Sequence, residues 1–225
     1  MHYHLSPGMS FCFISVGAVV LDLEADRYYR LDSWHSAGLR ALAVGEAGAN
    51  SDACASLVDK GILRHGEGPR ATPVHAPYVC ESAIEQRSER RPVGEPALSP
   101  FELFAGRLAA GQALSRLGLL RTVEYYRRQR DRYLDRRNPA QCQRTFAAAT
   151  AASFSERRRF FPAKRRCVPD SLALAATLWR RGCEAQVFFG VRLDPFAAHC
   201  WVQQGNLLLS DPLDSVAEFC PVFEL

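Results

Sequence analysis

Hydrophobic residues between positions 10 and 31 fall into three short runs that predict three β-strands. The runs are SFCFIS (10–15), AVVLDL (18–23) and RYYRL (27–31), with one turn at Gly17 and another at EAD. β-Branched and aromatic residues favour strands, and short turns between such runs are typical of an antiparallel meander. Asp32 and Ser33 then predict the N-cap of a helix over residues 34–45.

A second helix and a Pro-rich segment complete the first part of the chain. Ser51 is a capping candidate for a helix that stops at Gly61, and ILRHGE closes the unit. Pro, Gly and charged residues then dominate positions 66–100, which is typical of a linker. We therefore expect a small domain over residues 1–75 and a linker over residues 76–100.

The remainder of the chain has helical spacing first and strand patterns afterwards. Apolar residues recur at helical intervals over 101–135, Asn138-Pro139 breaks the helix, and a second helix follows. From Cys167 the pattern predicts an Ala- and Leu-rich helix and then three strands, EAQVFFGVR, HCWVQQ and NLLLSD, the last two joined by a turn at Gly205-Asn206. We expect a second domain over 101–225, and an α+β class for the whole chain.

Composition narrows the class of protein. With 225 residues, 48% hydrophobic and 23% charged, the chain can build folded cores, and bulk disorder is excluded. The apolar run from Phe11 to Leu21 is shorter than the roughly 20 residues of a membrane-spanning helix. Acidic residues follow this run and no Lys or Arg precedes it, so we expect no secretion signal and a cytoplasmic protein. The eight cysteines, which form no C-x-x-C pair, are then expected to be reduced.

One cysteine is placed for nucleophilic chemistry. Cys167 stands at the start of the predicted Ala- and Leu-rich helix, where unpaired N–H groups and the neighbouring Arg165 and Arg166 favour a thiolate. His199 follows 32 positions later on a predicted strand, and Asp211 comes 12 positions after it at the end of the next strand. A hairpin can place these two side by side, so that the carboxylate orients the imidazole and the imidazole takes the thiol proton.

Other interpretations of these residues stay open. A cysteine beside a helix, a histidine on an apolar strand and an aspartate before a proline are each common in structural roles. A zinc site could be drawn from Cys167, Cys183, His199 and Cys200, but their spacings match no common ligand pattern, so we predict no metal site. Cys200 should point to the strand face opposite His199 and pack in the core.

The order of Cys on a helix start, then His and Asp on successive strands, fits a papain-like or transglutaminase-like cysteine protease fold. More specifically, the segments CVPDSLAL, FFGVRLDPFAAHCWV and LLLSD resemble the lasso peptide biosynthesis B proteins, which are leader peptidases of transglutaminase-like fold. The resemblance covers residues 140–225. It implies that Cys167 is the nucleophile, His199 the base and Asp211 the orienting acid, and that Trp201 is a packing or cleft-wall residue.

The N-terminal segment GAVVLDLEADRYYRLD is similar to PqqD-like precursor-recognition domains, which have a small winged-helix-like shape. In that family the third strand accepts the leader peptide as an added strand, and a helix forms the other wall. An edge strand suits this role because its N–H and C=O groups are free and its side chains offer pockets. The expected leader-binding residues are Arg27, Tyr28, Tyr29, Arg30 and Leu31 on the strand, with Leu57 and Val58 on the helix. The alternative is a small domain that only stabilises the enzyme.

Two Arg-rich stretches, RTVEYYRRQRDRYLDRR and RRRFFPAKRR, raise the question of nucleic acid. Residues 1–75 carry eight acidic residues against six Lys and Arg, a net charge of −2, whereas DNA-reading domains are normally basic. We therefore expect no nucleic-acid partner. The stretch that ends at Arg166 could attract an acidic segment of a precursor peptide instead, or form a solvated basic rim.

The resemblance implies a protein that binds the leader of a ribosomally made precursor and cuts it from the core peptide. The freed core would pass to a partner, a separate asparagine-synthetase-like lasso cyclase that uses ATP to close a macrolactam. The sequence contains no phosphate-binding loop, so no cofactor is expected, and the dependence of leader release on ATP stays open. Two alternatives are a non-catalytic scaffold or chaperone for the cyclase, and a transglutaminase or amidase that acts on an unrelated substrate.

Overall fold

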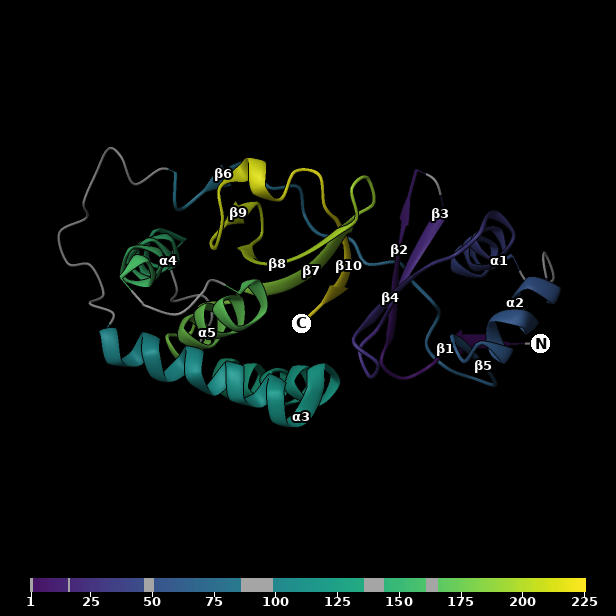
Figure 1. The fold of residues 1–225 in the computed structure, drawn as a ribbon, viewed down its shortest axis with the longest axis horizontal. Helices are drawn as coiled ribbons and strands as arrows, with labels where there is room; N and C mark the ends of the chain where they lie inside the picture. Colours follow the sequence, from purple (N-terminus) through teal and green to yellow (C-terminus); the bar gives the residue numbers. More distant parts are fainter. Residues whose placement is uncertain (1, 16, 47–50, 86–98, 136–143, 161–165) are drawn as a thin grey trace. The chain divides into compact units, whose positions relative to one another are not determined.

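The structure is a computed structural model in which the chain divides into two compact units (Figure 1). It describes residues 2–15, 17–46, 51–85, 99–135, 144–160 and 166–225. The first unit contains residues 1–75 and 220–223, and the second contains residues 76–219 and 224–225. None of the described helices combines the length and the apolar character that a membrane crossing would require.

The three predicted N-terminal strands are confirmed. They are β2 (Met9–Ile14), β3 (Gly17–Asp22) and β4 (Arg27–Arg30), which form an antiparallel sheet in the order β2-β3-β4. The turn between β2 and β3 requires Gly17, whose φ is +142° and whose missing side chain leaves space for the Ser36 hydroxyl. That hydroxyl accepts a hydrogen bond from the Ala18 N–H at 3.0 Å, which fixes the first helix against the sheet.

Two helices follow the sheet as expected, α1 (Ser33–Val44) and α2 (Ser51–Asp59). Asp32 caps α1, because its carboxylate accepts a hydrogen bond from the His35 N–H at 2.8 Å. The sequence analysis missed β1 (Tyr3–Leu5), which pairs antiparallel with β5 (Leu63–His65). The sheet, the helices and this ladder bury one apolar core that includes Phe11, Val20, Leu39, Leu57 and Leu63.

The second unit contains three helices that lie against one another. They are α3 (Pro100–Asp135), α4 (Arg144–Arg159) and α5 (Cys167–Arg180). The single helix predicted over 101–135 is interrupted at Gly118, whose φ of 75° and ψ of 177° separate two helical segments. The predicted break at Asn138-Pro139 lies outside the described residues.

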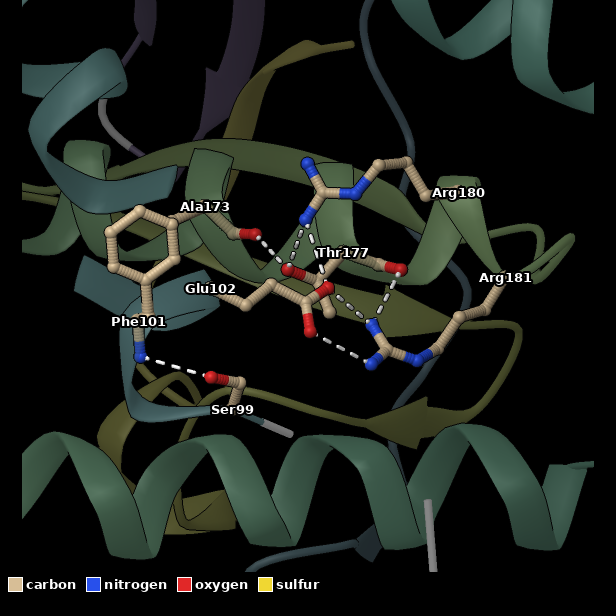
Figure 2. A network of polar contacts seen from close by, with 7 residues as sticks. All are labelled: Ser99, Phe101, Glu102, Ala173, Thr177, Arg180 and Arg181. Carbon is tan, nitrogen blue, oxygen red and sulfur yellow. Dashed lines mark hydrogen bonds and ion pairs between the residues drawn. The ribbon is translucent and has the colours of Figure 1, made fainter. Parts of the chain in front are cut away.

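An ion-pair network joins the start of α3 to the end of α5 (Figure 2). The Glu102 carboxylate accepts hydrogen bonds from Arg181 at 2.9 and 3.1 Å and from Arg180 at 3.2 Å. Arg180 also contacts the Thr177 hydroxyl at 3.2 Å. Bidentate contacts of this kind fix geometry as well as adding energy, so α5 is anchored at the end opposite Cys167.

A five-stranded sheet, whose strands other than β10 lie in the second unit, has the strand order β10-β7-β8-β9-β6. Its strands are β6 (Glu81–Ser82), β7 (Gln186–Arg192), β8 (Ala197–Gln204), β9 (Leu207–Leu208) and β10 (Cys220–Glu224). β7, β8 and β9 are antiparallel, whereas β6 pairs with β9 in parallel. α5 packs on β7 and β8 and buries Trp179, whose indole N–H donates to the Ala185 carbonyl at 2.8 Å.

Two expectations need correction, and one segment without a prediction is placed by the structure. The linker predicted over 76–100 contains β6, which belongs to the sheet of the second unit; residues 86–98 of it lie outside the described part. The tail EFCPVFEL, which no pattern placed, forms β10. Cys183 is in a disulfide, so the expectation of reduced cysteines is wrong there, since an even number of cysteines permits such a pair. The free cysteines are Cys12, Cys54, Cys80, Cys167, Cys200 and Cys220.

Candidate active site

Cys167 is the first residue of α5 and is half-buried. The first N–H groups of a helix have no partner within the helix and carry partial positive charge, which favours an anion beside them. The helix is fixed on the neighbouring strand by Ser171, whose hydroxyl donates to the Cys200 carbonyl at 2.9 Å. This contact sets Cys167 in register with His199, the residue before Cys200 on β8. Arg165 lies outside the described residues, and Arg166 is exposed.

His199 lies between Cys167 and Asp211. Its Nε2 atom is 3.2 Å from Oδ1 of Asp211, and its side chain also contacts the Cys167 thiol. Because Nε2 faces the carboxylate, Nδ1 is the ring nitrogen left to exchange a proton with the thiol.

The charge of His199 depends on these two neighbours. Burial of the ring lowers its pKa, but the hydrogen bonds and negative charges of Asp211 and Cys167 outweigh burial and raise the pKa to about 9. The imidazolium form is therefore favoured near neutral pH. An imidazolium beside a cysteine stabilises the thiolate, which is the nucleophilic form.

A cavity of about 180 Å³ contains all three side chains. Its apolar lining comes from Ala151, Phe154, Leu174 and Leu209, and its polar lining from Ser155, Arg158, Asp170, Ser171 and Ser210, together with Cys167, His199, Cys200 and Asp211. The predicted nucleophile, base and acid thus converge on one space, with mixed apolar and charged walls. That arrangement is typical of a binding or catalytic site.

Asp170 is a cavity residue that the sequence analysis did not single out. Its Oδ1 atom accepts hydrogen bonds from Arg107 of α3 at 2.7 Å and from Arg158 of α4 at 2.9 Å. Its Oδ2 atom accepts a hydrogen bond from the Arg166 N–H at 3.2 Å, so the carboxylate also caps the start of α5. Arg158 is only 5% exposed, and an arginine this buried requires such a partner. The only signal in the sequence is the acid three positions after Cys167.

A comparison with protein-family models identifies the fold of this unit. Residues 105–224, more than half of the chain, match the model described as the transglutaminase-like superfamily. The chain belongs to the transglutaminase-like superfamily. Membership fits an activity of the cysteine peptidase or transglutaminase type, and the cavity contains the groups that such chemistry needs. No curated protein and no solved structure gives a match.

Two predicted residues of the transglutaminase-like unit, Trp201 and Cys200, follow His199 on β8. The Trp201 ring is 3% exposed, stacks on His199 with ring centroids 6.3 Å apart, and does not line the cavity. It is therefore a packing residue and not a cleft wall. Cys200 is buried, and burial holds the pKa of its thiol well above the usual range, so this thiol stays protonated. Within the described part of the chain, no group of three His, Cys, Asp or Glu residues could hold a metal ion.

The family match does not include residues 1–75, where the predicted leader-binding residues lie. Arg27, Tyr28, Tyr29 and Arg30 form β4, which among the described strands pairs with β3 alone and is an edge strand of its sheet. A pocket of about 410 Å³ lies beside it. Its lining residues are Met9, Asp22, Tyr29, Arg30, Leu31, Asp32, His35, Lys60 and Ile62.

The helical side of this pocket differs from the prediction. Leu57 is completely buried in the core of the unit, and Val58 packs against the same core. Neither lines the pocket; His35 at the start of α1 and Lys60 after α2 do. Leu57 was wrong as a groove residue because its face of α2 turns inward, where an apolar side chain is most stable.

Proposed function

We propose that the protein is a cysteine peptidase that releases the leader from a ribosomally made precursor peptide before a separate cyclase closes the core. The observation that carries the proposal is the convergence of Cys167, His199 and Asp211 on one cavity in a transglutaminase-like chain. The lasso-type resemblance of the segments around these residues supplies the substrate class. The cyclase partner and a cytoplasmic location are part of the same proposal.

The proposed reaction has two steps. The Cys167 thiolate attacks the scissile carbonyl carbon, the C–N bond breaks, and the His199 imidazolium gives its proton to the leaving amine. Water then attacks the thioester while His199 takes a proton from it, which yields the free carboxyl end of the leader and restores the thiolate and imidazolium. The Cys167 N–H at the start of α5 is one donor for the oxyanion in both steps.

The first unit would bind the leader along β4. An extended peptide can add to the free edge of this strand through main-chain hydrogen bonds, and one of its side chains can enter the adjacent pocket. Tyr29 and Arg30 lie on β4 and also line the pocket, so they are the strand residues best placed to contact the peptide. Binding there would raise the local concentration of the scissile bond at Cys167.

The test mixes the purified protein with the precursor encoded beside its gene and follows leader release by mass spectrometry. We expect release by the wild type, and none by Cys167→Ala or His199→Ala. Cys80→Ala is the matched control, because Cys80 is also a free thiol but is exposed and lies outside the cavity. Release that persists in both active-site variants would contradict the mechanism, and full maturation with Cys167→Ala would favour a scaffold.

Acyl transfer to an amine is the second candidate, because the family match fits a transglutaminase as well as a peptidase. Both reactions begin with the same thioester, and they differ in whether water or an amine attacks it. Adding a primary amine to the reaction distinguishes them. A product heavier by the amine, formed on substrates without a leader, would favour the transferase.

A further inference from the structure

Asp211 lies on an irregular segment, three residues beyond the end of β9. An orienting acid must keep its direction relative to the imidazole, and a side chain on such a segment needs contacts that fix it. Two serines make these contacts. One is next to Asp211 in the sequence, and the other is 129 positions away.

Ser210 fixes the carboxylate. Its hydroxyl accepts a hydrogen bond from the Val202 N–H of β8 at 2.9 Å and donates a short hydrogen bond to Oδ2 of Asp211. The other carboxylate oxygen, Oδ1, faces Nε2 of His199 at 3.2 Å. Both oxygens therefore have defined neighbours, and both contacts lead back to β8, the strand that carries His199.

Ser82 fixes the main chain of Asp211. It lies on β6 and is 1% exposed, and its hydroxyl donates to the Asp211 carbonyl at 2.8 Å. The same hydroxyl accepts from the Ile84 N–H at 3.3 Å, which sets its direction. The Ala83 N–H, which donates to the Leu208 carbonyl at 2.9 Å, ties this segment to β9 just before Asp211.

We propose that Ser82 and Ser210 are positioning residues for Asp211, and that the functional catalytic unit therefore begins at β6, upstream of the family match. The proposal rests on the proposed function only in taking Asp211 as the acid that acts on His199. Ser82 does not line the cavity, and the Ser210 hydroxyl is occupied by the Val202 N–H and the Asp211 carboxylate, so each serine acts through Asp211. The segment that looks like a linker in the sequence is thus part of the site.

The chemical consequence concerns the Cys167 thiolate. If the Ser210 hydroxyl is removed, the Asp211 carboxylate can rotate away from His199, and the imidazolium loses its nearest fixed anion. The proton then favours the sulfur over the ring, so the thiolate forms at a higher pH. Loss of the Ser82 hydroxyl should act in the same direction, since it releases the main chain that carries the carboxylate. The other charged groups in the cavity wall, Asp170 and Arg158, are paired with each other and are unchanged.

The test measures alkylation of Cys167 by iodoacetamide as a function of pH, with the modified peptide quantified by mass spectrometry. This readout needs no substrate. For Ser210→Ala we expect the midpoint to move to higher pH than in the wild type, and the rate at pH 6.5 to fall about tenfold, as for loss of a hydrogen bond to a charged group. Ser210→Thr, which keeps the hydroxyl, should restore the wild-type profile, and Ser82→Ala should shift it by less.

Two control variants separate positioning from folding. Thr177→Val removes a buried hydroxyl bond in the same unit, from Thr177 to the Ala173 carbonyl, and Ser115→Ala removes an exposed one on α3. Both should keep the Cys167 profile even where the melting temperature falls. The proposal is overturned if Ser210→Ala and Ser82→Ala keep the wild-type profile, or if Thr177→Val shifts it equally.

Leader release by the same variants distinguishes this proposal from the proposed function. In the peptidase assay Ser210→Ala should lower kcat about tenfold and leave KM unchanged, because the Ser210 hydroxyl is bonded to Val202 and Asp211 and acts on the reaction through the acid. If the wild type releases no leader but the alkylation profiles shift as expected, the positioning role stands and the peptidase function fails. If leader is released and neither kcat nor the profile changes in Ser210→Ala and Ser82→Ala, the positioning role fails and the peptidase stands.

Discussion

The cavity at Cys167 and the pocket beside β4 differ in their polar groups. The cavity offers side chains, whereas the pocket lies beside a strand edge that also offers main-chain groups. In the cavity the polar groups are side chains, and each acid is fixed by neighbours: Asp170 by two arginines, and Asp211 by two serines. Beside β4 the pocket is lined by polar side chains that include Asp32, His35 and Lys60, and the edge strand adds its main-chain N–H and C=O groups.

This difference matches two different tasks. Bond cleavage requires reacting atoms at fixed distances, and side chains meet that requirement only when other groups lock them. Recognition of an extended peptide depends on a main-chain ladder that tolerates many side chains, so fewer positions need to be fixed. The two regions should therefore fail independently, and the following predictions test that independence.

The largest effect should follow from removing the nucleophile. Cys167→Ala should lower leader release by at least about 1000-fold, because the whole catalytic group depends on the thiolate. The same variant should bind leader peptide with the wild-type Kd, measured by fluorescence anisotropy with a labelled leader. A loss of affinity in this variant would show that the two regions are not independent.

A change at the edge of β4 should have the opposite effect: it should weaken leader binding and leave the cleavage reaction intact. Leu31 N–H donates to the Ala18 carbonyl of β3, so alternation along the strand directs the Arg30 N–H away from β3, toward an added strand. Arg30→Pro removes that donor and should weaken leader binding about tenfold or more, as for loss of a ladder hydrogen bond with local strain.

Arg30→Ala is the matched control, because it removes the same side chain and keeps the N–H. Its Kd should stay much closer to that of the wild type. A short peptide that contains the cleavage site but little of the leader should be cut equally by all three proteins. Equal weakening by proline and alanine would mean that the side chain, and not the strand edge, contacts the peptide.

The third prediction concerns pH. Although burial lowers the His199 pKa, Asp211 and Cys167 raise it from 6.5 to about 9 in the folded protein. Because the folded protein favours the protonated ring, this contribution to stability is complete below pH 6.5 and is lost as the pH rises through 9. kcat/KM should fall over the same upper range, since the imidazolium that supports the thiolate disappears.

The measurement is a pH–rate profile together with melting temperatures between pH 6 and 10. Leader binding measured over this range should not follow the same titration, because His199 does not line the pocket beside β4. A melting temperature for His199→Gln that declines between pH 6.5 and 9 as steeply as that of the wild type would contradict the assignment.

The smallest effect should come from the network in Figure 2, because none of its residues lines the cavity at Cys167 or the pocket beside β4. Glu102→Gln should lower the free energy of unfolding by about 1 kcal/mol, as for a partly exposed ion pair. Burial raises the Glu102 pKa, but Arg181 and Arg180 outweigh it and lower the pKa below 4.5, so this contribution is present above pH 4.5 and is lost as the pH falls further. Chemical denaturation at pH 7 and pH 3 measures the free energy of unfolding and its pH dependence. The unfolding free energies of the wild type and the variant should become equal at pH 3.

Local patterns predicted much of this fold because most elements carry their own signals. The alternation in β2, β3 and β4, the Asp32 cap and the Ala- and Leu-rich α5 all lie in contiguous segments whose periodicity and end signals are visible. The grouping of Cys167, His199 and Asp211 was also expected, because a helix start and a hairpin leave few ways to arrange three side chains.

What the sequence did not reveal depends on contacts between distant segments. β6 is two residues long, lies in a Pro-rich stretch and pairs in parallel with a strand more than 120 residues later, so it has no local periodicity. The sequence therefore could not predict that Ser82 belongs to the site. Gly118 was missed for another reason: the apolar spacing continues on both sides of it, and a glycine within a helical pattern does not by itself predict a break.

The contact between Ser82 and Asp211 has a consequence for the order in which the protein folds. Closing a loop of 129 residues carries a large entropic cost, and contacts of such sequence separation generally form late. During synthesis, β6 leaves the ribosome long before β9 exists to receive it. The acid would thus reach its final position only after the surrounding helices and strands have assembled, which delays full nucleophilic reactivity until the folded enzyme is complete.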